Sequence, residues 1–224
     1  PAPYKLLIKN INLLYRMNYL PFYAKVDKKE MDSYKVTFMW NTENVPDRLA
    51  KLVPTTPDSI LYRSAVLRFD RDYSTDASPS DLTATEFMLK LAQESGYRAK
   101  KPFVWVYVDQ HTPQKVYVWQ NGKYIFTSPA NTGVMHTTAT GNFMIYARYR
   151  SVEMRGYFPG THEYYDDPAV PWVNFFYKGE AIHGYPRASY GYPQSAGCVE
   201  LPISKAKELY PLLYTYAVVT VSGE

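Results

Sequence analysis

The sequence has 224 residues, enough for one large domain or two small ones, and its 46% hydrophobic and 21% charged residues are typical of a soluble protein with a well-formed core. Its formal net charge of +4 is mildly basic, but no dense Lys/Arg cluster stands out, which argues against nucleic-acid binding. The single cysteine excludes an internal disulfide, and no run approaches the roughly 20 apolar residues that a membrane span needs.

Residues 1–97 are predicted to form a small, mainly helical domain. Helices are expected at 11–17, 46–52 and 57–69, with a short strand at 36–40. Thr83-Ala84-Thr85-Glu86 matches a capping box, so a further helix is expected from Thr83 to near Gly96. The stretch 96–102 is polar, basic and closed by proline, as is typical of a domain boundary.

Residues 102–224 are predicted to form a β-rich domain, because the apolar pattern changes from helical spacing to alternation. Strands are expected at 103–108, 115–120, 123–127, 142–149, 171–177, 181–183 and 216–221. Asn121-Gly122 favours a tight hairpin turn, and one clear helix is expected between Pro202 and Pro211. The chain is therefore predicted to be a multi-domain α+β protein, with a helical domain followed by a β-rich one.

One long polar stretch, residues 151–167, is predicted to be an irregular loop. It contains Gly156, Pro159 and Gly160 together with paired tyrosines. A loop of that length inside a compact domain is usually functional and is often a lid.

The only cysteine, Cys198, follows the small residues Ser195-Ala196-Gly197 and precedes the helix expected at Pro202. A helix N-terminus and a nearby imidazole both favour a thiolate over a thiol. The amides of Gly197 and Cys198 are candidates for binding the oxyanion of an attacked carbonyl. A free cysteine is, however, more often an inert buried side chain. The residues alone leave both interpretations open.

His183 ends a predicted strand and is followed at once by Gly184. A cysteine with a histidine brought near it by the fold is the minimum requirement for a thiol nucleophile and its base. A buried histidine satisfied by its neighbours is about as good an interpretation from the residues alone. The other three histidines lie in predicted loops, and no histidine pair has metal-ligand spacing, so no metal site is predicted.

The run His183-Gly184, followed by Ser195-Ala196-Gly197-Cys198-Val199, resembles the signature of the L,D-transpeptidase (YkuD-type) catalytic domain. That signature is a histidine, a spacer of a dozen or so residues, and then Ser/Thr-His-Gly-Cys. Asn131-Thr132-Gly133 and Thr140-Gly141-Asn142-Phe143 resemble two further stretches of the family, and the likeness covers about 103–221. Residues 11–92 resemble an N-terminal peptidoglycan-binding domain.

The resemblance implies roles for individual residues. Cys198 would be the nucleophile, His183 its general base, and the carbonyl of Gly184 the group that orients the histidine. The amides of Gly197 and Cys198 would hold the oxyanion, and Ser195 would support the turn. Residues 151–172 would form a lid over the substrate. The substrate-binding residues implied in this way are Tyr165, Trp172, Tyr185 and Arg187.

Two positions depart from the family pattern. Ala196 stands where the family has its second histidine, and Glu200 stands where Arg or Asn is usual. The first change leaves the Cys–His pair intact, whereas the second bears on how the charges of the acyl donor are read.

The family implies a peptidoglycan L,D-transpeptidase, which forms a cysteine thioester on a tetrapeptide stem, releases D-alanine and makes a 3→3 cross-link. An L,D-carboxypeptidase with the same Cys–His site and a non-catalytic wall-binding protein are the alternatives. The implied partners are peptidoglycan stem peptides and glycan, with carbapenem-type β-lactams as covalent inhibitors; no cofactor is expected.

Such a protein works outside the cytoplasm, at the cell wall, and a weakly cationic chain suits that anionic matrix. The sequence begins at Pro1 without a charged-then-apolar leader. We therefore expect any signal or membrane anchor to lie outside this sequence.

Overall fold

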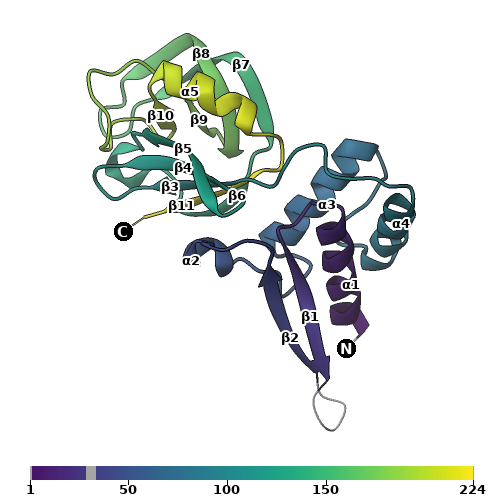
Figure 1. Cartoon of the computed structure of the whole chain (residues 1–224). Coiled ribbons are helices and arrows are strands. Elements are labelled where there is room, and N and C mark those ends of the chain that lie inside the picture. Colours follow the sequence, from purple (N-terminus) through teal and green to yellow (C-terminus); the bar gives the residue numbers. More distant parts are fainter. Residues whose placement is uncertain (1, 29–33, 224) are drawn as a thin grey trace. The chain divides into compact units, whose positions relative to one another are not determined.

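The structure is a computed structural model that describes residues 2–28 and 34–223. The chain divides into two compact units, one with the residues up to Phe103 and Asn121–Lys123, the other with Val104–Gln120 and the residues from Tyr124 onwards (Figure 1). The expected domain limits, 1–97 and 102–224, stay a prediction.

The N-terminal unit combines helices with a β-hairpin. Its elements are α1 (Ala2–Arg16), β1 (Phe22–Lys28), β2 (Tyr34–Trp40), α2 (Asp47–Ala50), α3 (Ile60–Tyr73) and α4 (Leu82–Glu94). The helix expected at 11–17 begins much earlier, because its buried stripe already includes Leu7 as well as Ile11 and Leu14.

Strand β1 is missing from the sequence-based prediction. It runs antiparallel to β2, and its last four residues are exposed. Asn12 of α1 holds the strand in place: its Oδ1 accepts the Ala24 amide at 2.7 Å, and its Nδ2 donates to the Ala24 carbonyl at 3.1 Å. A side chain that replaces ladder partners in this way leaves no periodic signal in the sequence.

Helix α4 begins with a different cap from the one expected. Asp81 is the N-cap, and its Oδ1 accepts the amide of Ala84 at 2.9 Å. Thr83 lies inside the helix, so the predicted capping box is wrong. Glu86 instead pairs with Lys90, whose Nζ lies 2.7 Å from Oε1. Asp and Thr both serve as N-caps, so a sequence that offers both two residues apart does not decide between them.

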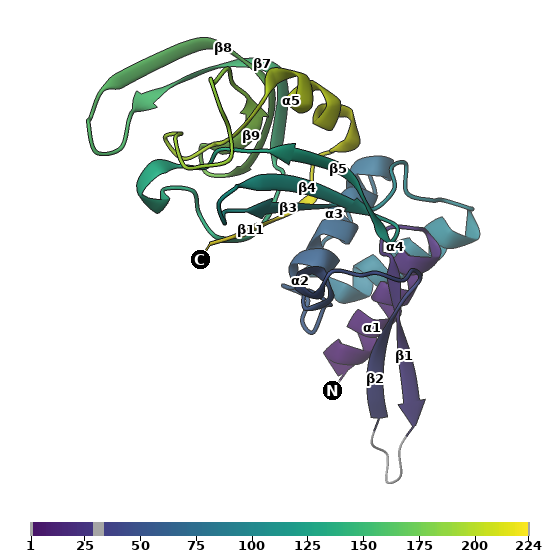
Figure 2. The same ribbon diagram turned by 60° about the vertical axis from the view of Figure 1, so that its left-hand side comes forward.

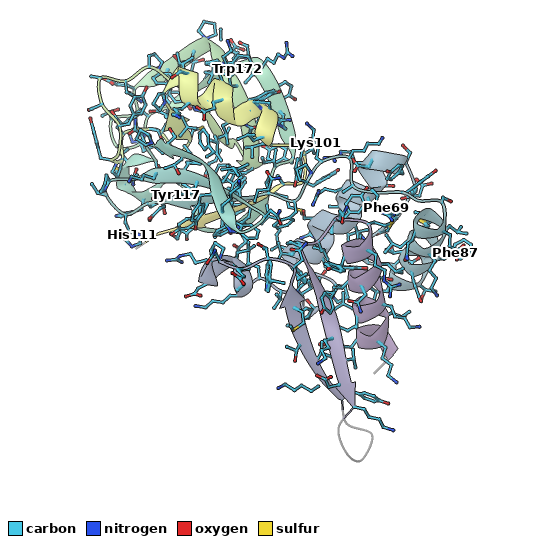
Figure 3. The ribbon with its side chains drawn as sticks, viewed as in Figure 1. Phe69, Phe87, Lys101, His111, Tyr117 and Trp172 are labelled. Atoms are coloured by element: carbon cyan, nitrogen blue, oxygen red, sulfur yellow. The ribbon has the colours of Figure 1, made fainter. Side chains whose placement is uncertain are left out.

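A buried arginine joins the segments of the N-terminal unit. Arg68 of α3 is 1% exposed and donates to the carbonyls of Tyr19 and Lys101 at 3.0 and 3.1 Å. Hydrogen bonds of this kind offset the cost of burying the charge. In Figure 3, Phe69 lies within the unit and Phe87 of α4 on its outside, and Phe87 is 63% exposed.

The C-terminal unit is built from two β-sheets. Its elements are β3 (Trp105–Asp109), β4 (Lys115–Gln120), β5 (Lys123–Pro129), η1 (Val134–His136), β6 (Gly141–Met144), β7 (Ala147–Tyr157), β8 (Tyr164–Tyr177), β9 (Glu180–Gly184), β10 (Val199–Leu201), α5 (Ile203–Leu209), η2 (Tyr210–Leu212) and β11 (Val218–Ser222). One sheet has the order β5-β4-β3-β11-β6 and the other β10-β9-β8-β7. Their buried faces share one apolar core, which includes Val106, Ile182 and Val199.

Strands β7 and β8 form a long antiparallel hairpin, which Figure 2 shows clearly. Residues 151–167 were expected to be an irregular loop and 151–172 a lid, but only 158–163 lie between the two strands. The loop prediction is wrong. None of the side chains of β7 is fully buried, but Val152 and Met154 alternate with exposed Glu153 and Arg155 and pack against the cluster of Val170 and Val173, so a short strand signal was present and was missed.

A short strand, β10, separates Cys198 from the helix that follows. β10 runs parallel to β9, with Val199 opposite Ile182, and α5 begins only at Ile203. Helix α5 packs on β9: a Cβ added to Gly184 would lie 3.2 Å from Ala206 Cβ and from Ile203 Cα. The helix predicted to start at Pro202 is confirmed, since Pro202 is the N-cap of α5, and β10 lies between that helix start and Cys198.

Candidate active site

His183 is held at the end of β9 by its own main chain. Its Nδ1 lies 2.9 Å from the carbonyl oxygen of Gly184. Because a carbonyl only accepts hydrogen bonds, Nδ1 carries the proton, and Nε2 of the neutral ring is left as an acceptor. Burial lowers the pKa of His183, although the hydrogen bond to Gly184 acts in the opposite direction. The imidazole is therefore neutral at pH 7 and available as a base.

The turn before Cys198 is braced by Ser195. The Ser195 hydroxyl donates to the Cys198 carbonyl at 2.5 Å and accepts the Gly197 amide at 3.1 Å. Gly197 has a φ of 149°, a conformation that side-chain-bearing residues rarely adopt. The Gly197 amide, expected to bind an oxyanion, is thus already engaged by Ser195.

The segment from Asn131 to Thr138 also supports this turn. The Thr138 hydroxyl donates to the Gly197 carbonyl and accepts the amide of Gly133, both at 2.7 Å. A Cβ on Gly133 would lie 2.9 Å from Gly197 Cα, so the two backbones approach closely. The Asn131-Thr132-Gly133 stretch noted in the sequence therefore packs against the cysteine turn.

The thiol of Cys198 is half-buried and lies 3.8 Å from the carbonyl oxygen of Gly179. Burial raises its pKa to about 12, and the carboxylates of Glu200 and Glu180 act in the same direction, against a hydrogen bond from the Ala181 backbone. The sequence-based expectation of a thiolate is therefore wrong for the resting state. Cysteine and histidine are both neutral at pH 7.

His183 and Cys198 line the same cavity, which has a volume of about 420 Å³. Its walls come from the β7–β8 hairpin, from β9 and its preceding turn, and from residues 185–200. They include Met154, Phe158, Tyr165, Asp167, Val170, Lys178, Gly179, Glu180, Tyr185, Arg187, Ser195, Ala196, Gly197 and Glu200. The fold thus brings together the two residues that the sequence singled out.

Arg187 does not present a free cation to this cavity. Its Nε and Nη2 donate to the two carboxylate oxygens of Glu200 at 2.8 and 2.9 Å, and its guanidinium stacks on Tyr185 at 4.7 Å. Glu200, noted as a departure from the family pattern, is therefore paired with Arg187, which the resemblance implied to be a substrate-binding residue.

The four predicted substrate-binding residues separate into two groups. Tyr165, Tyr185 and Arg187 line the cavity. Trp172 instead packs against Tyr210, with ring centroids 5.5 Å apart, and lies beside α5 (Figure 3). Placing Trp172 over the substrate was wrong, because Trp172 lies in the part of β8 that packs against the core and does not line the cavity.

Three residues of the site were not found from the sequence. Thr138 supports the cysteine turn, Asp167 accepts the Tyr185 hydroxyl at 3.3 Å, and Glu180 accepts the Ala139 amide at 3.0 Å. Each is an ordinary polar residue without a motif. Glu180 directly precedes the strand predicted at 181–183, which was the one available signal.

In the part of the chain that the structure describes, no group of three or more His, Cys, Asp or Glu side chains is arranged to hold a metal ion. None of the helices within residues 2–28 and 34–223 is long and apolar enough to cross a bilayer.

A cysteine and a backbone-oriented histidine in one cavity are the minimum that a site with a thiol nucleophile and its base requires. Residues 104–221, more than half of the chain, match the sequence model of the L,D-transpeptidase catalytic domain, YkuD. The chain therefore belongs to the YkuD L,D-transpeptidase family. This confirms the expected family and the expected order of a helical part before a β-rich catalytic domain. The match does not include the N-terminal unit, whose peptidoglycan-binding role stays a prediction.

Solved structures of the same family resemble the chain. An L,D-transpeptidase from Mycobacterium smegmatis is 22% identical, with 54% of this chain and 58% of that chain covered and a TM-score of 0.49. L,D-transpeptidase 3 from Mycobacterium tuberculosis, in complex with a faropenem-derived adduct, is 20% identical, with 54% and 60% covered and a TM-score of 0.48. One from Stackebrandtia nassauensis is 24% identical, with 75% and 80% covered and a TM-score of 0.42. None of the curated proteins matches the chain significantly.

Proposed function

We propose that this chain is a peptidoglycan L,D-transpeptidase with Cys198 as nucleophile and His183 as its base. The sulfur attacks the carbonyl before the terminal D-alanine of a tetrapeptide stem while Nε2 of His183 takes the thiol proton. The C–N bond breaks, D-alanine leaves with that proton, and a thioester remains. The side-chain amine of the third residue of a second stem then attacks the thioester, and a proton reaches the departing sulfur through His183. The product is a 3→3 cross-link.

The observation that carries this proposal is the free Nε2 of His183, in a cavity shared with the only cysteine of the chain. Because both groups are neutral at rest, proton transfer accompanies the attack of the sulfur and does not precede it. The Cys198 amide is the oxyanion donor in this scheme, since the Gly197 amide is bound by Ser195.

The proposal includes a location and a role for the N-terminal unit. Peptidoglycan stems lie outside the cytoplasm, so the protein acts at the cell wall, secreted or anchored. The N-terminal unit binds the wall. Both statements rest on the resemblance seen in the sequence.

The mass of the intact protein after carbapenem treatment tests the proposal. Wild-type protein is expected to gain the mass of one inhibitor, as is the control Thr127→Val, whose side chain is exposed on β5. Cys198→Ala is expected to gain none. An adduct that survives this substitution contradicts the proposal.

A defined tetrapeptide then separates the three activities. Cross-linked dimers indicate transpeptidation, tripeptides without dimers indicate a carboxypeptidase, and neither product, together with no adduct, indicates a non-catalytic wall-binding protein.

A further inference from the structure

Glu180 lines the cavity that contains Cys198 and lies at the other end of β9 from His183. It is the first residue of β9, and the Sγ of Cys198 contacts the carbonyl of the preceding residue, Gly179, at 3.8 Å. In the parallel register Val199 is level with Ile182, so Cys198 comes level with Ala181, between Glu180 and His183. A Cβ added to Gly197 would lie 3.9 Å from Glu180 Cγ, so the Glu180 side chain reaches the cysteine turn.

The surroundings of Glu180 leave its charge largely uncompensated. Its Oε2 accepts the Ala139 amide at 3.0 Å, and within residues 2–28 and 34–223 no hydrogen bond or ion pair is formed by Oε1. The cation that faces it is Lys178, whose Nζ lies over the Tyr177 ring at 5.2 Å and outside ion-pair distance of Glu180.

The other two carboxylates of the cavity have side-chain donors. Glu200 is bound by both arms of Arg187, and Asp167 accepts the Tyr185 hydroxyl. Glu180 is therefore the carboxylate that is available to a cationic ligand beside the thiol.

Aminolysis of a thioester by an alkyl amine needs a second proton acceptor. Such an amine has a pKa of about 10.4 in water, so it arrives as an ammonium ion. It loses one proton before it can attack and a second as the amide forms. His183 passes the second proton to the departing sulfur, which leaves the first without an acceptor in the proposed scheme.

We propose that Glu180 binds the side-chain ammonium group of the second stem peptide and takes its first proton. This inference rests on the proposed function and names the chemistry of its second substrate, a primary alkyl ammonium. The proton moves from nitrogen to the carboxylate, the free amine attacks the thioester carbon, and Glu180 later returns its proton to water. Burial raises the pKa of Glu180, which makes its carboxylate a better base than an exposed one.

The test compares wild type with Glu180→Gln, which keeps the size of the side chain and its bond to the Ala139 amide, and with the control Glu208→Gln, an exposed carboxylate paired with Lys205. Three quantities are measured: the rate of carbapenem acylation, the ratio of cross-linked to hydrolysed product from a tetrapeptide donor, and transfer to hydroxylamine, which is uncharged at neutral pH.

Glu180→Gln is expected to lower transfer to the alkyl ammonium acceptor at least about 10-fold, with acylation and transfer to hydroxylamine close to wild type. Glu180→Asp, which keeps the charge, is expected to retain part of the transfer, and Glu208→Gln all of it. Equal losses of acylation and of transfer to both amines in Glu180→Gln overturn the inference, as does unchanged cross-linking. If wild type is not acylated at all, it is the proposed function that fails.

Discussion

Arg187 and Glu200 form a two-armed ion pair in the wall of the cavity that contains Cys198. Nε meets Oε2 at 2.8 Å and Nη2 meets Oε1 at 2.9 Å, while Glu200 is opposite His183 in the parallel ladder. The pair thus ties the loop after β9 to the strand after the cysteine. The guanidinium group of Arg187, from the loop after β9, is thus held in the cavity wall by the carboxylate of Glu200.

The two ends of this ion pair are predicted to differ in importance for stability. The side chain of Glu200 is 6% exposed and that of Arg187 is 28% exposed. Arg187→Gln strands a buried carboxylate and is expected to cost about 3 kcal/mol of unfolding free energy, whereas Glu200→Gln leaves a half-exposed cation and is expected to cost clearly less. Urea denaturation measures both. Lys205→Gln, which breaks an exposed pair, should change stability by less than about 1 kcal/mol. Equal losses of unfolding free energy in Arg187→Gln and Glu200→Gln would show that burial of the remaining charge does not determine the loss.

The rate of Cys198 alkylation is predicted to rise with pH without the plateau that a low-pKa thiolate would show. Its pKa is raised to about 12, so the thiolate fraction keeps increasing as the pH rises. The rate constant for iodoacetamide, followed by intact mass from about pH 6 to about pH 10, is expected to rise throughout, relative to a free cysteine derivative in the same buffers. A plateau at or below pH 8.5 contradicts the neutral resting pair.

Thr138→Val is predicted to loosen the cysteine turn. The substitution removes the donor to the Gly197 carbonyl and the acceptor of the Gly133 amide, both in a buried site. Unfolding free energy is expected to fall by about 1–3 kcal/mol, and carbapenem acylation is expected to slow because the thiol is less well positioned. Thr127→Val, on the exposed side of β5, is the matched control, with stability and acylation as in wild type. Acylation at the wild-type rate in Thr138→Val would show that the support is not needed for chemistry.

Asp81→Ala is predicted to destabilise the N-terminal unit by about 1 kcal/mol, since Asp81 caps α4. Thr83→Ala, in the helix interior, is expected to leave stability unchanged or slightly raised, because alanine is the better helix former. Thermal unfolding followed by circular dichroism separates the two. A larger loss of stability in Thr83→Ala than in Asp81→Ala would support the predicted capping box instead.

Features that depend on neighbouring residues were predicted well. Asn121 and Gly122 both have positive φ values, 50° and 85°, as the expected tight turn requires, and β4 lies beside β5. The His183 and Cys198 segments lie side by side as β9 and the turn before β10. A local preference, or a spacing specific enough to identify the family, was sufficient in these cases.

Features that depend on distant packing were not predicted. The β7–β8 hairpin was not predicted as a strand pair, because the alternation of Val152 and Met154 with charged residues is short and no side chain of β7 is fully buried. Likewise, Trp172 and Arg187 find their partners Tyr210 and Glu200 only in the folded chain. The charge state of Cys198 depends on surrounding atoms and was therefore predicted in the wrong direction.

The acceptor of the His183 ring proton is part of the peptide backbone, and this determines what a mutational scan can detect. No replacement side chain deletes the Gly184 carbonyl, so scanning would reveal only two of the three groups in the proposed mechanism. The third is recorded in the sequence only as the lack of a side chain at position 184, where added atoms would collide with α5. Anyone transplanting these groups to another scaffold has to copy the position of a main-chain carbonyl as well as two side chains.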